Sequence, residues 1–200
     1  MTDFSKGAAF IHGRCVPIAD ARISLLDWGF LHLGATYDVA HVWQGRFLGI
    51  DDYINRFHAS MANLRMSVPF DRDQIRSIMI ELVKLSELRE AYVEIICTRG
   101  TPEPGSRDLR TCQNKFLAFA IPFIWIATTE QRERGLNLLV SQQQRIAPES
   151  IGPRVKNYHW LDLVKALFEA YDQEADTAVL IDAQGNLVEG PGFNIFARLG

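Results

Sequence analysis

Two side chains late in the chain, Lys156 and Glu189, have the types and surroundings that chemistry could use. The lysine lies in residues 154–160, RVKNYHW, and the glutamate opens residues 189–196, EGPGFNIF. A lysine amine can hold an aldehyde as a Schiff base, and a carboxylate can keep a pyridine nitrogen protonated so that the ring accepts electrons. This pair is what a pyridoxal phosphate enzyme needs, and pyridoxal 5'-phosphate is the cofactor that we expect.

The neighbours of Lys156 favour a catalytic lysine over an ordinary surface lysine. Val155, Tyr158 and Trp160 are bulky and largely apolar. Burial beside them would disfavour the charged ammonium, as an imine-forming lysine requires. The alternative is a lysine at the end of a strand, whose stem passes Trp160 while its charge stays in water.

Glu189 is followed by two glycines, Gly190 and Gly192, which favour a binding role. Glycines let the backbone turn sharply and lie close to a flat ring. The alternative is a solvent-facing glutamate at the end of a hairpin. Because Glu-Gly-x-Gly is common by itself, the prediction depends on its combination with the upstream lysine.

Periodicity in the sequence predicts a mixture of strands and helices. Alternating or β-branched segments predict strands over residues 9–12, 15–18, 35–43, 46–48, 91–99, 115–121, 136–142, 177–181 and 186–189. Helices are predicted after an N-cap at Asp51, after a capping-box start at Asp71, and around the apolar residues Leu161, Val164, Phe168 and Tyr171.

Composition excludes several classes of partner. The net charge of −3 and the pI near 6.0 give no electrostatic case for nucleic acid or an anionic membrane. No window resembles a membrane span, and the N-terminus is not a signal peptide. The cysteines, Cys15, Cys97 and Cys112, are odd in number and far apart, which indicates a reduced, cytoplasmic chain. The five histidines show no metal-ligand spacing, so no metal is expected.

Several further segments, in order along the chain, resemble the fold type IV pyridoxal phosphate enzymes, the class IV aminotransferases. These segments are residues 21–30, 36–39, 48–56, 98–100, 155–157 with Trp160 and Asp162, and 189–194. The resemblance implies a two-domain α+β fold like that of D-amino acid aminotransferase, and a homodimer. It places a small N-terminal α/β domain at residues 1–121, a connection at 122–135, and the start of a larger cofactor-binding domain at 136–200.

The resemblance also implies roles for single residues. Lys156 would be the Schiff-base lysine and proton shuttle, and Glu189 would pair with the pyridine nitrogen. Arg56 would hold the cofactor phosphate, for which a planar guanidinium is well suited; the alternative is an exposed helix arginine. The turn after Glu189 would bind the cofactor through Gly192, Phe193 and Asn194.

The substrate pocket resembles that of (R)-selective amine transaminases. Their pattern is matched by residues 92–100 and by Phe193. Aromatic walls suit an apolar amine substituent, and Glu94 would disfavour a substrate carboxylate. By this resemblance the pocket residues are His32, Tyr37, Tyr92, Glu94 and Trp160, with Arg107 as a loop arginine for keto-acid carboxylates and Arg110 as its rival.

The expected reaction moves an amino group between an R-configured amine or amino acid and a keto acid or ketone. A branched-chain or D-amino acid aminotransferase, or an aminodeoxychorismate-type lyase of the same fold, remains an alternative. Members of the family continue past residue 194 with loops that bind the phosphate. We therefore expect an incomplete second domain and weak or absent cofactor binding by these 200 residues, with an inactive fragment as the further alternative.

Overall fold

The computed structural model describes residues 4–198, which form two compact units. The first unit contains the chain up to Ile124 together with Arg154–Tyr158, and the second contains Trp125–Pro153 and the chain from His159 onward. No helix within the described residues is both long enough and apolar enough to cross a membrane.

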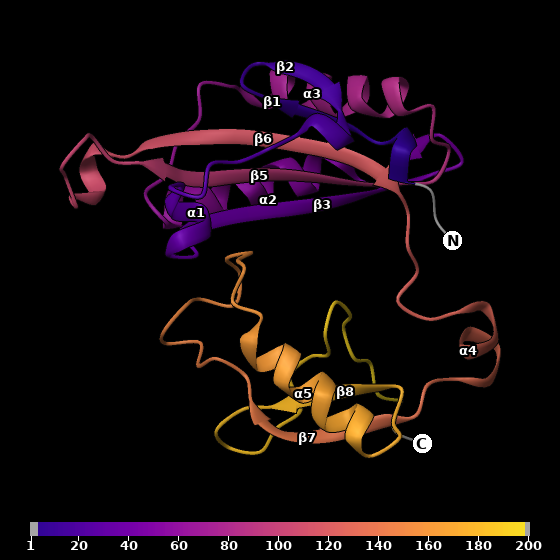
Figure 1. Ribbon diagram of the computed structural model, residues 1–200. Helices are drawn as coiled ribbons and strands as arrows, with labels where there is room; N and C mark the ends of the chain where they lie inside the picture. Colours follow the sequence, from indigo (N-terminus) through magenta and orange to yellow (C-terminus); the bar gives the residue numbers. More distant parts are fainter. Residues whose placement is uncertain (1–3, 199–200) are drawn as a thin grey trace. The chain divides into compact units, whose positions relative to one another are not determined.

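An antiparallel sheet of six strands is the centre of the first unit (Figure 1). Its strand order is β2-β1-β6-β5-β3-β4. The strands are β1 (Ala8–Ile11), β2 (Arg14–Pro17), β3 (Ala35–Trp43), β4 (Arg46–Phe47), β5 (Ala91–Thr101) and β6 (Gln113–Pro122). All six strands that the sequence predicts in this region are confirmed, with small differences at their ends.

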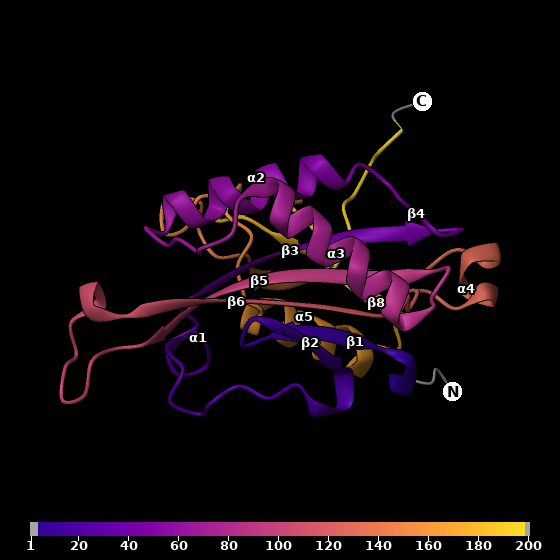
Figure 2. The same ribbon diagram turned by 90° about the horizontal axis from the view of Figure 1, so that it is seen from above.

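Two helices, α2 (Ile50–Asn63) and α3 (Arg72–Ser86), cover one face of this sheet (Figure 2). The capping box predicted at Asp71 is confirmed, because its side chain and that of Gln74 each bond the other's backbone. The N-cap predicted at Asp51 is wrong: Gly49 caps α2 with φ of +64°, and Asp51 lies in the first turn. An aspartate there still interacts favourably with the helix dipole.

The core of the first unit lies between the two helices and the sheet. Phe57 and Met79, from the two helices, and Val93 and Ile95, from β5, are completely buried there. Since alternate residues of a strand face opposite sides, the other residues of β5, including Tyr92 and Glu94, face away from the helices.

A buried aspartate ties the short helix α1 (Trp28–Leu31) to the sheet. Asp27 is 1% exposed, accepts hydrogen bonds from the Gly29 amide and the Thr98 hydroxyl, and pairs with Lys115 at 3.2 Å. Three short 3-10 helices complete the unit: η1 (Phe4–Lys6), η2 (Ile18–Asp20) and η3 (Leu109–Thr111).

The segment Arg154–Tyr158 belongs to the first unit, although it follows part of the second unit in sequence. Asn157 forms an antiparallel bridge with Thr36 of β3. The Thr36 hydroxyl donates to the Lys156 carbonyl at 2.6 Å, and the Lys156 amide donates to Ser60 Oγ at 3.3 Å. The domain boundaries expected from the sequence are continuous and do not place this segment in the first unit. It lies there because it pairs with β3, which is distant in sequence.

The second unit contains a parallel pair of strands, β7 (Leu138–Gln144) and β8 (Thr177–Ile181), joined through α5 (Leu161–Asp172). Its core is small and consists of Leu163, Ala166, Ala170, Ala178 and Leu180. A further short helix, α4 (Thr129–Arg134), begins with a capping box at Thr128. It lies in the stretch that the sequence predicts only as a connection.

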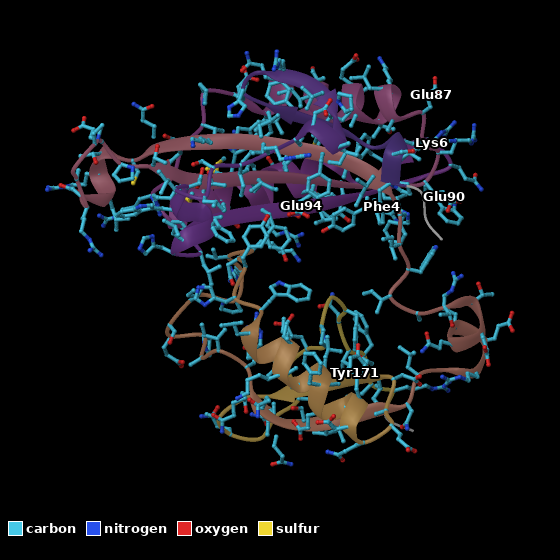
Figure 3. The ribbon with its side chains drawn as sticks, in the orientation of Figure 1. Phe4, Lys6, Glu87, Glu90, Glu94 and Tyr171 are labelled. Atoms are coloured by element: carbon cyan, nitrogen blue, oxygen red, sulfur yellow. The ribbon has the colours of Figure 1, made fainter. Side chains whose placement is uncertain are left out.

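Helix α5 is confirmed, but its expected apolar face is not the face that packs on the strands. Phe168 and Tyr171 are 63% and 54% exposed. Figure 3 labels Tyr171 on this helix. The buried residues are Leu163, Ala166 and Ala170. Small alanines let a helix lie close to a sheet. The prediction was based on the spacing of the large apolar side chains and therefore assigned the wrong face.

The chain turns back after β8 and so reaches Glu189. The predicted hairpin around Gln184 is present as a single antiparallel bridge between Ile181 and Leu187. Leu180 donates its amide to the Glu189 carbonyl at 2.9 Å and accepts from the Val188 amide at 2.9 Å. The limb from residue 186 to 189 is therefore paired by these bonds without forming a regular strand.

Two glycines allow the close approach of β5 and β6 to be tested. A Cβ on Gly100, whose φ is +75°, would lie 1.7 Å from the Gln113 carbonyl oxygen, whereas Gly105, at +78°, has open space around it. We expect Gly105→Ala to cost about 1–2 kcal/mol through backbone strain alone. Gly100→Ala should cost at least about 2 kcal/mol more, because it also forces the strands apart. Urea unfolding measures both, and equal losses of stability would contradict the close contact.

Candidate active site

The Lys156 side chain is half-buried and lies against an aromatic ring. Its Nζ is 5.3 Å from the centroid of the Tyr37 ring, which projects from β3. The lysine main chain is held on both sides, by the Thr36 hydroxyl and by Ser60 Oγ. These bonds to β3 and α2 restrict where the amine can reach, because they fix the backbone that carries it.

Tyr158 continues the same short segment and binds the sheet face that carries Tyr37. The two rings stack with centroids 4.4 Å apart and planes at 28°. The Tyr158 hydroxyl donates to Glu94 Oε1 at 2.6 Å. In an extended segment, residues two apart point to the same side, so Lys156 and Tyr158 both meet Tyr37.

Glu94 is the polar centre of this face, which lies opposite α3 (Figure 3). It is 7% exposed, and its second oxygen, Oε2, accepts from the Tyr92 hydroxyl at 2.7 Å. Burial raises the pKa of Glu94, while the bonds from Tyr158 and Tyr92 and the charge of Lys156 lower it in part. The net direction is upward, because desolvation of a carboxylate is the largest effect.

The two tyrosines remain hydrogen-bond donors across the neutral pH range. Burial, and then the charge of Glu94, raise the pKa of both Tyr92 and Tyr158 far above the ordinary value of a phenol. Both carboxylate oxygens of Glu94 therefore have a permanent donor. The expected pocket residues Tyr37, Tyr92 and Glu94 thus lie together with Lys156. Tyr158, which the sequence analysis named only as a bulky neighbour of Lys156, is an addition to this group.

Arg56 is held by a buried aspartate on the helix side of β3. Its Nε and Nη2 donate to the two carboxylate oxygens of Asp38, each at 2.7 Å. The Asp38 side chain is fully buried, whereas that of Arg56 is 48% exposed. The hydrogen bond to Asp38 raises the pKa of Arg56. Among the described residues, Nη1 donates to no other group, so part of the guanidinium is available to an anion.

Asp38 was missed as a functional residue, although a signal was present. An acidic residue at an inward position of a strand, as in residues 36–39, needs a charged or hydrogen-bonding partner. The arginine of the following helix is the partner that this reasoning could have found.

The two other expected substrate residues of the first unit are exposed. His32 is the C-cap of α1, and its ring lies 4.5 Å from that of Trp28. Arg107 is in the loop that extends beyond β5 and β6 (Figure 1), where it has no hydrogen bond or ion pair to another described residue. Its rival Arg110 pairs with Asp108 at 2.6 Å. Neither His32 nor Arg107 bonds to Lys156 or Glu94.

In the second unit, Glu189 is bound by an arginine. Its Oε1 accepts from Arg145 Nε at 2.7 Å. The same arginine donates through Nη1 to Asp162 Oδ2, also at 2.7 Å. Arg145 was not expected as a site residue, and its only sequence signal is that it is a basic residue shortly after the strand predicted over residues 136–142.

The turn after Glu189 is compact. Gly190 and Phe193 exchange backbone hydrogen bonds of 3.2 and 3.3 Å, and the Phe193 ring packs where a Gly190 side chain would be. Gly192 has φ of +86°, which favours glycine. A Cβ on Gly192 would lie 3.9 Å from the Trp160 ring, so Trp160, the N-cap residue of α5, is beside this turn. Asn194 is exposed.

The raised pKa of Glu94 predicts a pH dependence of stability. The folded chain holds the Glu94 proton more tightly than the unfolded chain, so this stabilisation is complete below the unfolded pKa, about 4.3. It is lost as pH rises through the higher folded pKa. We therefore expect wild type to lose stability relative to Glu94→Gln as pH rises from about 4.3 toward neutrality.

Urea unfolding of both proteins at several pH values measures this difference. The exposed loop carboxyl variant Glu103→Gln is the control and should run parallel to wild type. Parallel curves for Glu94→Gln and wild type would contradict the raised pKa.

Comparison with known proteins shows the family to which this chain belongs. Residues 35–200 match the protein family described as "Amino-transferase class IV". The "Putative branched-chain-amino-acid aminotransferase" of Methanocaldococcus jannaschii is 26% identical over 187 residues, which are 94% of this chain and 64% of that protein. The "D-alanine aminotransferase" of Listeria innocua is 23% identical over 175 residues, 85% of this chain and 58% of that protein.

Solved structures show the same fold. The branched-chain amino acid aminotransferase of Escherichia coli superimposes with a TM-score of 0.84 at 18% identity, over 94% of this chain and 62% of that one. That of Thermobaculum terrenum, in its PLP-form, gives 0.76 at 20% identity, over 92% of this chain and 61% of that one.

The expected α+β aminotransferase fold is confirmed by these superpositions. The chain spans about 60% of the length of the relatives and structures that it matches. Because the family match covers most of the chain, the protein belongs to the class IV aminotransferases.

Proposed function

We propose that this protein is a pyridoxal phosphate-dependent transaminase, which moves an amino group between an amine or amino acid and a keto acid or ketone. The observation that carries the proposal is the Lys156 amine, held over Tyr37 by a main chain paired to β3. Membership of the class IV family, and relatives named as aminotransferases, support it.

When each unit is considered separately, its side chains fit chemical groups of pyridoxal phosphate: the aldehyde and the phosphate in the first unit, and the ring nitrogen in the second. Lys156 offers a primary amine for the aldehyde. Arg56 has its Nη1 available for the phosphate while Asp38 holds the other nitrogens. Glu189 has one carboxylate oxygen that accepts no hydrogen bond from another described residue, which suits a protonated ring nitrogen. The turn of Gly192, Phe193 and Asn194 is proposed to lie against the cofactor.

The reaction needs a movable proton and an acceptor for electrons. Bound pyridoxal phosphate supplies an electron-poor ring that accepts the electron pair of the broken bond at the substrate carbon. Lys156 Nζ would take the proton from that carbon as a general base and would deliver it to the cofactor C4′ carbon as a general acid. The Tyr37 ring supports the amine, and the Tyr158–Glu94 hydrogen bond fixes Tyr158 against Tyr37.

Titration with pyridoxal phosphate tests the role of Lys156. In line with the weak cofactor binding expected for these 200 residues, we expect a weak visible absorbance band in wild type at high cofactor concentration, which Lys156→Ala abolishes and the exposed control Lys165→Ala retains. After borohydride reduction, mass spectrometry should find the cofactor attached to the peptide that contains Lys156. A band in Lys156→Ala, or none in wild type up to millimolar cofactor, would contradict cofactor binding through this lysine.

For the substrate, we propose an R-configured amine with an apolar substituent. Tyr37, Tyr92 and Tyr158 surround Glu94 on one sheet face, and such an aromatic surface suits an apolar group. When ionised, Glu94 would repel a substrate carboxylate. His32 and Trp160 are proposed as further pocket walls, and Arg107 as the group that binds a keto-acid carboxylate.

A second candidate is an aminotransferase that acts on amino acids. Its support is that the relatives carry the names of branched-chain and D-alanine aminotransferases. A lyase of the same fold would use the same lysine for elimination. Amino-group transfer to a ketone separates both transaminases from the lyase.

Donor preference distinguishes the candidates. With pyruvate as acceptor, we expect kcat/KM for (R)-1-phenylethylamine to exceed that for D-alanine and L-leucine by about tenfold or more, because one charge repulsion of about 1.4 kcal/mol has that effect. Glu94→Gln should reduce this difference in kcat/KM, because removing the carboxylate charge raises kcat/KM for D-alanine and L-leucine. Faster turnover of either amino acid by wild type would refute the amine preference, and (S)-1-phenylethylamine is the stereochemical control.

We propose a homodimer, with residues 1–121 as a small domain, 122–135 as the connection and 136–200 in a larger cofactor-binding domain. Leu25, Leu26 and Phe30, near α1, are 72%, 69% and 57% exposed, which supports an apolar contact with another chain. Light scattering should give twice the chain mass of 22.7 kDa, and a monomer would refute the dimer.

We also propose a cytoplasmic location, which the three free cysteines support.

A further inference from the structure

Arg145, just beyond β7, joins two carboxylates that lie far apart in sequence. Its Nε donates to Glu189 Oε1 and its Nη1 donates to Asp162 Oδ2, both at 2.7 Å. Nη1 also donates to the His159 carbonyl at 3.2 Å. One guanidinium therefore connects the end of β7, the start of α5 and the hairpin limb that ends at Glu189.

The Asp162 end of this connection is rigid. Its Oδ2 also accepts from the Ile146 amide and its Oδ1 from the Leu163 amide, both at 2.9 Å. Burial raises the pKa of Asp162, but the bonds from Arg145 and from these two amides outweigh burial, so the pKa is lowered. Asp162 is thus an anion anchored by α5 itself, and it fixes one end of the arginine.

At the Glu189 end, only one of the two carboxylate oxygens accepts a hydrogen bond from a described residue. The Arg145 and Asp162 side chains are 15% and 18% exposed, whereas that of Glu189 is 38% exposed. Within the described residues, Glu189 Oε2 accepts no hydrogen bond. Arg145 therefore holds one oxygen of Glu189 in place and leaves the other accessible.

The charges of the three side chains do not balance. With both carboxylates ionised, there are two negative charges and one positive charge, so one negative charge remains. For Arg145 itself, burial lowers the pKa but the bonds to Glu189 and Asp162 more than compensate, so its pKa is raised and it stays a cation. A protonated ring nitrogen at Oε2 would bring the group to neutrality.

We propose that Arg145 is a positioning residue, which fixes the Glu189 carboxylate so that Oε2 accepts a hydrogen bond from a protonated pyridine nitrogen. The inference rests on the proposed role of Glu189 in cofactor binding. A purely structural arginine would tie the same elements together, but its removal would leave the protonation of the bound ring unchanged.

The first measurement uses the full chain without cofactor. In a 15N NMR spectrum of arginine side chains, the Arg145 Nε–H signal is assigned by its loss in Arg145→Lys. We expect this signal to exchange slowly with water and to shift in Glu189→Gln. Arg134→Met removes an arginine that pairs with Asp176 in the same unit, and it should leave the signal unchanged. An Arg145 Nε–H signal that exchanges fast with water and does not shift in Glu189→Gln would overturn the proposal.

The second measurement uses pyridoxal phosphate labelled with 15N in its ring. In wild type and in the control Arg134→Met, the bound ring signal should be that of a protonated nitrogen. In Arg145→Met it should move toward the unprotonated position, with a rise in Kd of about tenfold, as is typical when a group that orients a ligand-binding residue is lost. If Arg145→Met does not fold, Arg145→Lys takes its place, since it keeps the charge but not the paired donors.

The two measurements separate the inference from the function on which it rests. An unchanged ring signal and Kd in the folded Arg145 variant would overturn the role of Arg145 while leaving cofactor binding intact. If wild type binds no labelled cofactor, the proposed function fails for this chain, and the Arg145 Nε–H signal alone decides whether Arg145 positions Glu189.

Discussion

The burial of the Glu94 carboxylate is the constraint on which the arrangement around Lys156 depends. A carboxylate removed from water must be hydrogen-bonded, and the hydroxyls of Tyr92 and Tyr158 satisfy both of its oxygens. Tyr158 is only two residues from Lys156, so the same bond that satisfies Glu94 also holds the lysine segment on the face of Tyr37. The amine is thus placed by a packing requirement that lies outside the lysine itself.

Ion pairs position the other candidate groups by the same physical principle. Asp38 is fully buried and directs the guanidinium of Arg56, while Arg145 takes one oxygen of Glu189. In both pairs the partner uses part of the hydrogen-bonding capacity of the functional group and leaves the rest available. Preorganisation of this kind reduces the cost of ordering a side chain when a ligand binds.

Local signals predicted most of the elements, because they depend on nearby residues. The strand over Ala35–Trp43 and the capping box at Asp71 are present as expected. The predictions were wrong where two residues or two helix faces could each have served the same role. Gly49 adopts a left-handed conformation and caps α2 in place of Asp51, and on α5 small alanines face the strands while Phe168 is exposed.

The sequence by itself determined the candidate chemistry, because a lysine and a Glu-Gly-x-Gly turn are local features with recognisable neighbours. It also determined family membership, through ordered matches along the chain. Only the tertiary structure decided which groups support them. Tyr158 is 64 residues from Glu94, and Arg145 is 44 residues from Glu189. These contacts depend on the pairing of distant strands and on burial, and no short-range pattern in the sequence encodes either.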